Sequence, residues 1–151
     1  MTRPFTLQPL LEIMQNRADE ATRHLGKLIA AEQDAKARLQ MLEQYRAEYA
    51  ERMCEASAQG LTPTALRNYQ EFLARIDQAI TQQAGVVKHS EVQTAHGQQH
   101  WKSQNKQLKA IDTLAVRHEA RERHLEGKQE QKLLDEYTTR KFSAPKEDES
   151  D

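Results

Sequence analysis

A single compact turn signal, Gly60-Leu61-Thr62-Pro63, constrains this sequence more than any other feature, because two very long stretches with helical periodicity flank it. Gly60 can adopt the left-handed backbone conformation that ends a helix. Thr62 carries the side-chain oxygen of a helix N-cap, and Pro63 suits the first helical position because it has no N–H to leave unpaired. We therefore predict that the chain folds back on itself at a turn over residues 58–62.

Apolar and small residues recur at alternating steps of three and four ahead of this turn. This is the heptad pattern of a coiled coil, which is narrower than the apolar stripe of a helix on a globular core. Within the series only Glu32 and Arg46 are charged. Its members are Leu11, Met14, Ala18, Ala21, Leu25, Leu28, Glu32, Ala35, Leu39, Leu42, Arg46, Tyr49 and Met53. After an irregular lead at residues 1–8, we expect a first helix over residues 9–57.

The same spacing resumes after the turn and keeps its register across a polar stretch at residues 88–100. No proline occurs between Pro63 and Pro145, so no missing N–H interrupts the helical hydrogen bonds. The repeating positions are Leu66, Tyr69, Leu73, Ile76, Ile80, Gln83, Val87, Trp101, Leu108, Ile111 and Ala115. We expect one helix over residues 63–141, with Gly97 as a point where it can bend, and a disordered acidic tail at residues 143–151.

The composition fits the class of long helices rather than a compact core, since 30% of the residues are charged and only 5% are aromatic. We predict an all-α fold in which two long helices form an antiparallel coiled-coil hairpin, one domain over residues 1–142. A formal net charge of −1 gives no field that would attract nucleic acid. No membrane span or signal peptide is recognisable, and the single Cys54 cannot form an internal disulfide, which fits the cytoplasm.

An antiparallel hairpin also predicts which residues face each other. If the chain reverses at residues 60–61, the numbers of facing residues add up to about 121 or 122, which places Trp101 opposite Ala21 and Gly97 opposite Leu25. Large residues then meet small ones, as close packing requires. The second helix overhangs the first beyond about residue 118, and an overhanging helix with an apolar stripe usually docks on a partner or frays. The stripe here is Leu125, Leu133 and Tyr137.

Three histidines raise the question of a metal site. His96 and His100 lie four residues apart and His89 one heptad earlier, which can place imidazoles on one helix face. The zinc-peptidase motif needs Glu directly after the first His, but Gly97 stands there, and no nearby Cys or carboxylate completes a ligand set. We therefore expect solvated histidines and no cofactor; a zinc hydrolase is the alternative, and it predicts stoichiometric bound metal.

Catalytic motifs are not recognisable elsewhere in the sequence. There is no glycine-rich phosphate loop and no nucleophile elbow. A two-helix coiled coil also offers no concave site from which water is excluded. We predict that the protein is not an enzyme and has no small-molecule substrate.

More apolar and aromatic residues occur near the turn than the interface between two helices can bury. The pairing rule places three residues of the first helix opposite three of the second: Leu42, Tyr45 and Tyr49 opposite Ala79, Ile76 and Phe72, with Met41 close by. One interpretation is a widened core with partly covered aromatics. The other is an exposed docking surface, because aromatic residues of this kind are frequent binding hot spots.

The residues around this surface resemble the FliJ family of flagellar type III export proteins. The resemblance is carried by L-x-M-L-x-x-Y-x-x-E-Y from Leu39 to Tyr49, by N-Y-Q-x-F-x-x-x-I-x-x-A-I from Asn68 to Ile80, and by Trp101. It implies a cytoplasmic stalk, peripheral on the inner face of the cell membrane at the flagellar base. Such a stalk is similar to the gamma subunit of rotary ATPases.

The resemblance also implies partners. The end with both termini would enter a hexameric export ATPase, with Leu125, Leu133 and Tyr137 as a candidate contact, and export chaperones would bind the same chain. The surface that binds the cytoplasmic part of the export gate would be Leu42, Tyr45, Tyr49, Phe72, Ile76 and Ala79. At its rim, Arg38 replaces the family's Gln and Gln83 replaces its His.

Two alternatives remain open at the level of sequence. One is the equivalent stalk of a virulence type III secretion system. The other is a generic coiled-coil spacer or homodimer, in which the aromatic surface would be the dimer contact. An elongated monomer is expected for the stalk, so sedimentation separates it from the homodimer.

Overall fold

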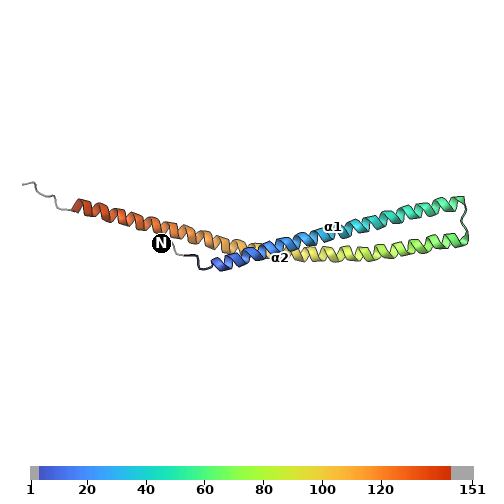
Figure 1. Cartoon of the computed structure of the whole chain (residues 1–151), viewed down its shortest axis with the longest axis horizontal. Coiled ribbons are helices and arrows are strands. Elements are labelled where there is room, and N and C mark those ends of the chain that lie inside the picture. Colours follow the sequence, from blue (N-terminus) through green and yellow to red (C-terminus); the bar gives the residue numbers. More distant parts are fainter. Residues whose placement is uncertain (1–3, 144–151) are drawn as a thin grey trace, which may run out of the picture. The chain divides into compact units, whose positions relative to one another are not determined.

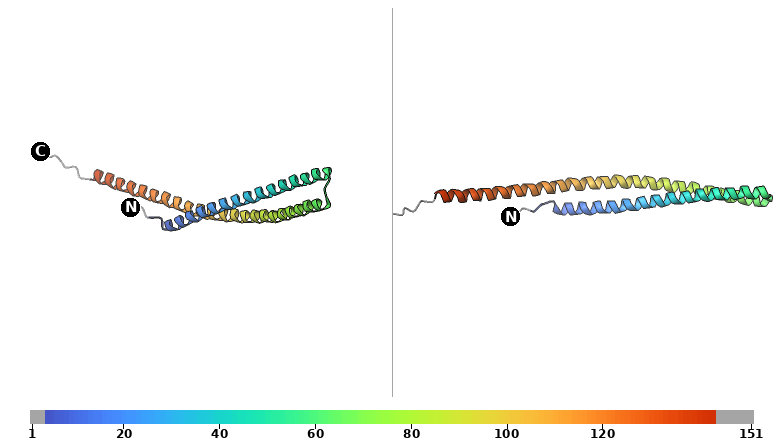
Figure 2. Two further views of the ribbon diagram at one scale, coloured as in Figure 1. Left: turned by 45° about the vertical axis from the view of Figure 1, so that its right-hand side comes forward. Right: turned by 90° about the horizontal axis from the view of Figure 1, so that it is seen from above.

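The computed structural model describes residues 4–143, and they form two helices without a strand. Helix α1 spans Gln8–Gln59 and helix α2 spans Pro63–Ser143. The predicted helices, 9–57 and 63–141, start or end within two residues of these bounds. Figures 1 and 2 show that α1 and the first part of α2 lie side by side and are antiparallel, joined by the turn. The predicted fold class, an all-α helical hairpin, is confirmed.

In the turn, Gly60, Thr62 and Pro63 take the roles predicted from the sequence. Gly60 has a φ of 98°, in the left-handed region, and its N–H donates to the carbonyl of Ser57 at 3.2 Å. The hydroxyl of Thr62 accepts a hydrogen bond from the N–H of Ala65 at 3.2 Å, the geometry of an N-cap. Pro63 is the first residue of α2. Chain reversal is thus encoded locally, by four consecutive residues.

The chain divides into two units. The first, here called the hairpin unit, is Arg17–Asn105 and contains the turn and most of α1. The second, here called the terminal unit, combines the residues up to Asn16 with those from Lys106 onward. The two units are described separately below.

In the hairpin unit the core is a seam of heptad positions between α1 and α2. Every predicted α1 position of the seam in this unit, from Ala18 to Met53, is buried or half-buried. On α2 the seam runs on through Ser90, Thr94 and Gly97, so the heptad register does persist across the polar stretch. One predicted position was wrong: Leu66 is exposed, and Ala65, four residues before Tyr69, lies in the seam instead.

Contacts across the seam follow the predicted pairing. The rings of Tyr49 and Phe72 are 4.5 Å apart between centroids. Trp101 Nε1 donates a hydrogen bond to Thr22 Oγ1 at 2.9 Å, one residue from its predicted neighbour Ala21. A Cβ atom added to Gly97 would lie 3.5 Å from Leu25 Cδ1, the predicted contact, and 2.6 Å from Leu28 Cδ1. Gly97 therefore allows two leucines of α1 to approach the α2 backbone closely.

The terminal unit begins as a packed pair and ends as a solvated helix. Phe5, which precedes α1, stacks against His118 of α2 with ring centroids 5.4 Å apart. Met14, Ile111 and Ala115 are half-buried, whereas every described residue from Gly127 to Ser143 is exposed. Because α2 has 81 residues and α1 only 52, its C-terminal part has no stretch of α1 to cover it. Of the predicted disordered tail, Ser143 belongs to α2, and residues 144–151 lie outside the described part of the chain.

Candidate partner-binding site

Four rings from both helices form one cluster near the turn, called here the aromatic cluster: Tyr45, Tyr49, Tyr69 and Phe72. Tyr49 lies at its centre, 4.5 Å from Phe72, 5.3 Å from Tyr69 and 6.4 Å from Tyr45 between ring centroids. Tyr45 meets Phe72 nearly edge to face, at 6.2 Å and an interplanar angle of 77°. Such tilted and edge-on contacts are the favoured geometries for aromatic pairs.

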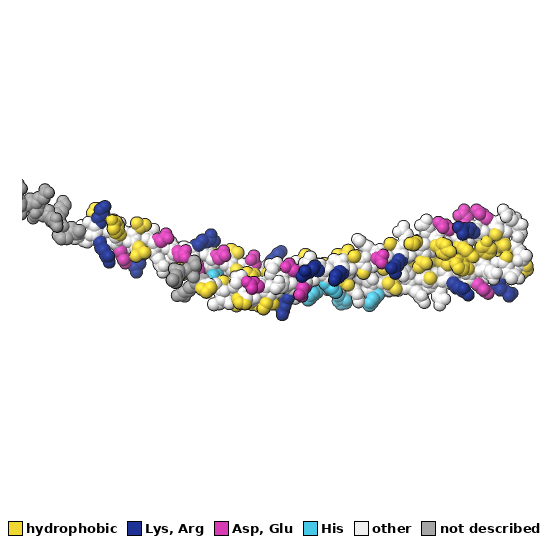
Figure 3. Space-filling view, viewed as in Figure 1, with side chains coloured by type: hydrophobic (Ala, Val, Ile, Leu, Met, Phe, Trp, Pro, Cys, Tyr) yellow, Lys and Arg dark blue, Asp and Glu magenta, His cyan; other side chains and the backbone are white. Residues whose placement is uncertain are grey.

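The six residues predicted to bind the export gate are brought together, but they differ in access. Tyr45 is 44% exposed, and Leu42, Tyr49, Phe72 and Ala79 are half-buried. Ile76 is only 5% exposed, so it supports the cluster from the core and offers little surface of its own. Figure 3 shows a contiguous hydrophobic area at the turn end of the molecule, bordered by charged side chains. The surface combines an apolar centre with a polar rim, as protein interfaces do.

A groove of about 430 Å³ continues this surface away from the turn. It is lined by Arg38, Met41, Leu42, Tyr45 and Gln83. Met41 is 66% exposed, the largest exposure among the apolar residues around the aromatic cluster. The two rim positions at which the sequence departs from the family pattern, Arg38 and Gln83, thus face one hollow from opposite helices. Sequence reasoning identified these residues singly and missed the groove.

One ion pair borders the apolar surface and joins the two helices. The guanidinium of Arg46 donates hydrogen bonds through Nε and Nη2 to the two carboxylate oxygens of Asp77. This bond and the negative charge of Asp77 raise the pKa of Arg46. Arg46 was predicted as a charged seam position, but its partner on α2 was not. The arrangement is bidentate, which fixes the geometry of both side chains.

Further from the turn, polar side chains join the apolar residues of the seam. Gln83 Nε2 donates to the carbonyl of Ala35 at 3.0 Å, and Thr94 Oγ1 donates to the carbonyl of Leu28 at 3.4 Å. The nearby hydroxyl of Thr94 and then the ammonium of Lys36 hold the pKa of Glu32 below its ordinary value. Lys36 Nζ lies 3.1 Å from Glu32 Oε1 and 3.6 Å from Glu91 Oε1. This network links α1 to α2 where the apolar pattern is weakest.

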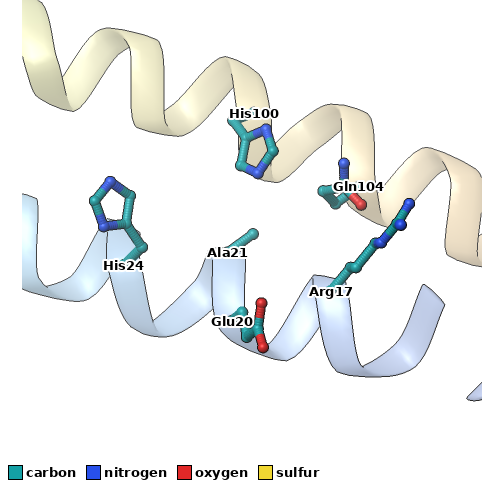
Figure 4. A pocket seen from close by; sticks show the side chains of 6 residues that line it. All are labelled: Arg17, Glu20, Ala21, His24, His100 and Gln104. Atoms are coloured by element: carbon teal, nitrogen blue, oxygen red, sulfur yellow. The ribbon is translucent and has the colours of Figure 1, made fainter. Parts of the chain in front are cut away.

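A second hollow, of about 490 Å³, lies beside the polar part of the seam (Figure 4). It is lined by Arg17, Glu20, Ala21, His24, His100 and Gln104. Gln104 Oε1 is buried and has no hydrogen-bond partner among the described residues. Neutral, acidic and basic side chains share the lining, so it favours no ligand of one charge.

The three histidines considered as metal ligands, His89, His96 and His100, are all exposed. His89 Nε2 lies 3.1 Å from Gln93 Nε2, one helical turn further along α2. Within residues 4–143, no group of three or more His, Cys, Asp or Glu side chains is arranged to hold a metal ion. Cys54 is a free, exposed thiol.

The residues predicted to contact the ATPase ring lie in the terminal unit. Leu125, Leu133 and Tyr137 are 45%, 65% and 66% exposed. Leu134 and Phe142 are equally accessible and were missed, because they fall outside the stripe of four-residue steps used to find the others. No described helix has an apolar stretch of the length and hydropathy needed to cross a bilayer.

Comparisons with known proteins agree with the resemblance of the turn region. The family model described as Flagellar FliJ protein matches residues 3–147. The flagellar FliJ protein of Escherichia coli (strain K12) is 27% identical over 140 residues, which cover 93% of this chain and 95% of that protein. The flagellar FliJ protein of Salmonella typhi is 26% identical with the same coverage. The match extends over nearly the whole chain, so this protein belongs to the FliJ family and is a component of flagellar protein export.

Proposed function

We propose that this protein is a non-enzymatic stalk that couples a hexameric flagellar export ATPase to the cytoplasmic domain of the export gate. The stalk lies in the cytoplasm, peripheral on the inner face of the cell membrane at the flagellar base. In this proposal the hairpin unit binds the gate and the terminal unit binds the ATPase. Export chaperones bind the same chain and are passed toward the gate.

The observation that carries this proposal is the aromatic cluster with its adjoining groove. Its rings are held by contacts within the chain, yet Tyr45 and Met41 remain open to a partner. Rigid aromatic side chains beside an apolar groove supply large contact area at little cost in conformational entropy. The bidentate pair of Arg46 with Asp77 joins the two helices next to this surface.

The gate contact is tested by replacing Tyr45 and Phe72 together by Ala and measuring binding to the purified cytoplasmic domain of the gate. We expect binding to weaken at least about tenfold, as loss of two hot-spot aromatics does. The matched control replaces Val86 and Val92, exposed apolar residues of α2 outside the cluster, by Ala. Undiminished binding by the aromatic variant, with helicity retained, would contradict the gate contact.

The ATPase contact is tested by truncating the chain from residue 119 onward. Leu125, Leu133 and Tyr137 are then lost while the hairpin unit is intact. Capture by the export ATPase should disappear, and gate binding should not change. Capture at the level of the full chain would show that the ATPase binds elsewhere.

The homodimer alternative makes the aromatic cluster a contact between two copies of this chain. Sedimentation at micromolar concentration distinguishes the two functions, because the stalk is expected to be monomeric. A dimer that dissociates when Tyr45 and Phe72 are replaced would support the alternative. The family match favours the flagellar system over a virulence system.

A further inference from the structure

In one stretch of the terminal unit most charges are separated by face, although they nearly cancel in sum. Between Arg117 and Lys132, helix α2 carries five Lys and Arg residues and four Glu residues. Four of the basic residues are spaced by four, seven and four positions, which keeps them on one side of an α-helix. We call them the basic face: Arg117, Arg121, Lys128 and Lys132.

The glutamates occupy the opposite side, together with the fifth basic residue, Arg123. Glu126 lies nine residues after Arg117 and Glu130 nine residues after Arg121. Nine residues at about 100° each correspond to half a turn beyond two full turns, so each Glu points away from its Arg. The four members of the basic face are exposed, and none forms an ion pair with another side chain among residues 4–143.

This arrangement is unfavourable for an isolated helix. Like charges four residues apart, such as Arg117 with Arg121 and Lys128 with Lys132, destabilise a helix, whereas opposite charges at that spacing stabilise it. The favourable order occurs in the hairpin unit, where Asp34 pairs with Arg38 at 3.5 Å, and also in the terminal unit outside the basic face, where Glu119 precedes Arg123 by four residues. The separation by face in the terminal unit therefore indicates a partner that supplies the missing negative charge.

A hollow borders the basic face, which contributes Lys128 and Lys132 to its lining. It is lined by Arg123, His124, Gly127, Lys128, Gln131, Lys132 and Asp135 and has a volume of about 740 Å³. Gly127 opens it, because a Cβ atom there would meet no atom within 4 Å. Basic side chains predominate in the lining, and the one carboxylate, Asp135, lies at its C-terminal end.

We propose that the basic face docks against an acidic surface of a protein partner and that the hollow at Gly127 admits one of its carboxylate side chains. The inference rests on the proposed function, which makes the export ATPase the partner of this part of α2. Nucleic acid and anionic lipid fit less well, because the glutamates behind the basic face repel extended phosphate arrays and the whole chain has a formal net charge of −1.

The test reverses the charge of each face in turn and measures affinity for the purified hexameric export ATPase at low and high salt. The variant R121E/K128E/K132E should lose at least about tenfold in affinity at low salt, and the matched variant E119K/E126K/E130K less than about threefold. Binding of the unmodified chain should weaken as salt rises, because salt screens the pairing of exposed charges. Circular dichroism checks that helicity is equal in all three chains.

A further variant leaves every charge in place. Gly127→Phe fills the hollow and removes a helix-destabilising glycine, so the helix should form at least as well as before. We expect it to weaken ATPase binding by about tenfold, because the partner's carboxylate side chain is displaced. Unchanged affinity of this variant would overturn the assignment of the hollow.

The outcomes separate this inference from the proposed function. If truncation from residue 119 abolishes ATPase binding while R121E/K128E/K132E binds normally, the ATPase contact stands and the basic face is wrong. If both charge-reversed variants lose affinity equally, the separation by face does not determine docking and the inference fails. If the truncated chain binds like the full chain, the proposed ATPase contact itself fails. Binding of duplex DNA or anionic vesicles through the basic face, without any difference toward the ATPase, would also overturn the inference.

Discussion

The two halves of the seam in the hairpin unit are held together by different forces. Near the turn, Leu73 and Ile76 are buried and the aromatic rings pack on one another. Further along, α1 and α2 meet through Thr94, Gly97 and hydrogen bonds from Gln83 and Trp101. Apolar burial is strong but non-directional, whereas each hydrogen bond requires a particular partner at a particular distance.

The difference shows how a long hairpin can combine stability with specific pairing. Moving α2 by one heptad would replace Leu73 with Leu66 or Ile80, which are equally apolar. The same shift would replace Thr94 with Val87 or Trp101, and Glu32 would lose its hydroxyl partner. A single polar position in a coiled coil is enough to disfavour wrong registers. We therefore expect the aromatic half to contribute most of the stability and the polar half to contribute selectivity.

The largest expected effect comes from the apolar half. Replacing Ile76, 5% exposed, by Ala should lower the free energy of unfolding by about 2–4 kcal/mol, through lost burial and the cavity left behind. Replacing Thr94 by Ala in the polar half should cost only about 1 kcal/mol. Urea unfolding followed by circular dichroism measures both. Equal losses of unfolding free energy in the two variants would show that the two halves do not differ in their contribution to stability.

A smaller effect is expected at Gly97, where leucines of α1 lie close to the α2 backbone. Gly97→Leu places a side chain against Leu28 Cδ1 and should destabilise the hairpin by about 1–3 kcal/mol, because the packed seam cannot accommodate it. The matched control is Gly85→Leu, where a Cβ atom meets nothing within 4 Å. That change should stabilise the helix by up to about 1 kcal/mol. Thermal unfolding of the two variants should thus shift in opposite directions.

Acid should weaken the polar half first. The pKa of Glu32 in the folded chain lies below its ordinary value of 4.5, because Thr94 and Lys36 bind the carboxylate. As pH falls, the unfolded state therefore takes up the proton before the folded state does. The contribution of the Glu32 charge to the free energy of unfolding is fully present above the pKa of the unfolded state, and it is lost as pH falls through the pKa of the folded state. Glu32→Gln should be less stable than the unmodified chain at neutral pH and lose this deficit in acid. A deficit that is constant with pH would show that the charge of Glu32 is irrelevant.

The smallest effect is expected for the ion pair beside the aromatic cluster. Arg46 and Asp77 are both about half-exposed, and solvent screens such a pair strongly. A double-mutant cycle with Arg46→Ala and Asp77→Ala should give a small favourable coupling that decreases with salt. A coupling larger than the cost of Thr94→Ala would show that electrostatics, and not apolar burial, dominate near the turn.

Most of the fold was predictable because the signals are local. Gly60, Thr62 and Pro63 specify the turn through backbone conformation and capping, which depend on few neighbours. The heptad spacing then specifies which face of each helix is covered. The error at Leu66 lies where α2 begins, within the first turns after the cap, and there Ala65 and Tyr69 carry the seam instead. Spacing alone cannot decide between neighbouring positions at a helix end.

The pairing of residues across the candidate site was predictable, but the exposure and shape of its surface were not. The pairing rule brought Tyr49 to Phe72, and the structure places their rings in contact. Which residues are accessible depends on side-chain rotamers, and these separate exposed Tyr45 from buried Ile76. The groove between Arg38 and Gln83 and the bond from Arg46 to Asp77 also depend on side-chain directions across two helices. The spacing of residues within one helix does not specify how side chains from two helices are directed toward each other.

The bond from Trp101 to Thr22 has a practical consequence, because this chain has one tryptophan and four tyrosines. Its indole fluorescence reports from a single place, the polar half of the seam, while three of the tyrosines belong to the aromatic cluster. Selective excitation of tryptophan therefore gives an intrinsic optical readout of whether α1 and α2 separate there when a partner binds, without any attached dye.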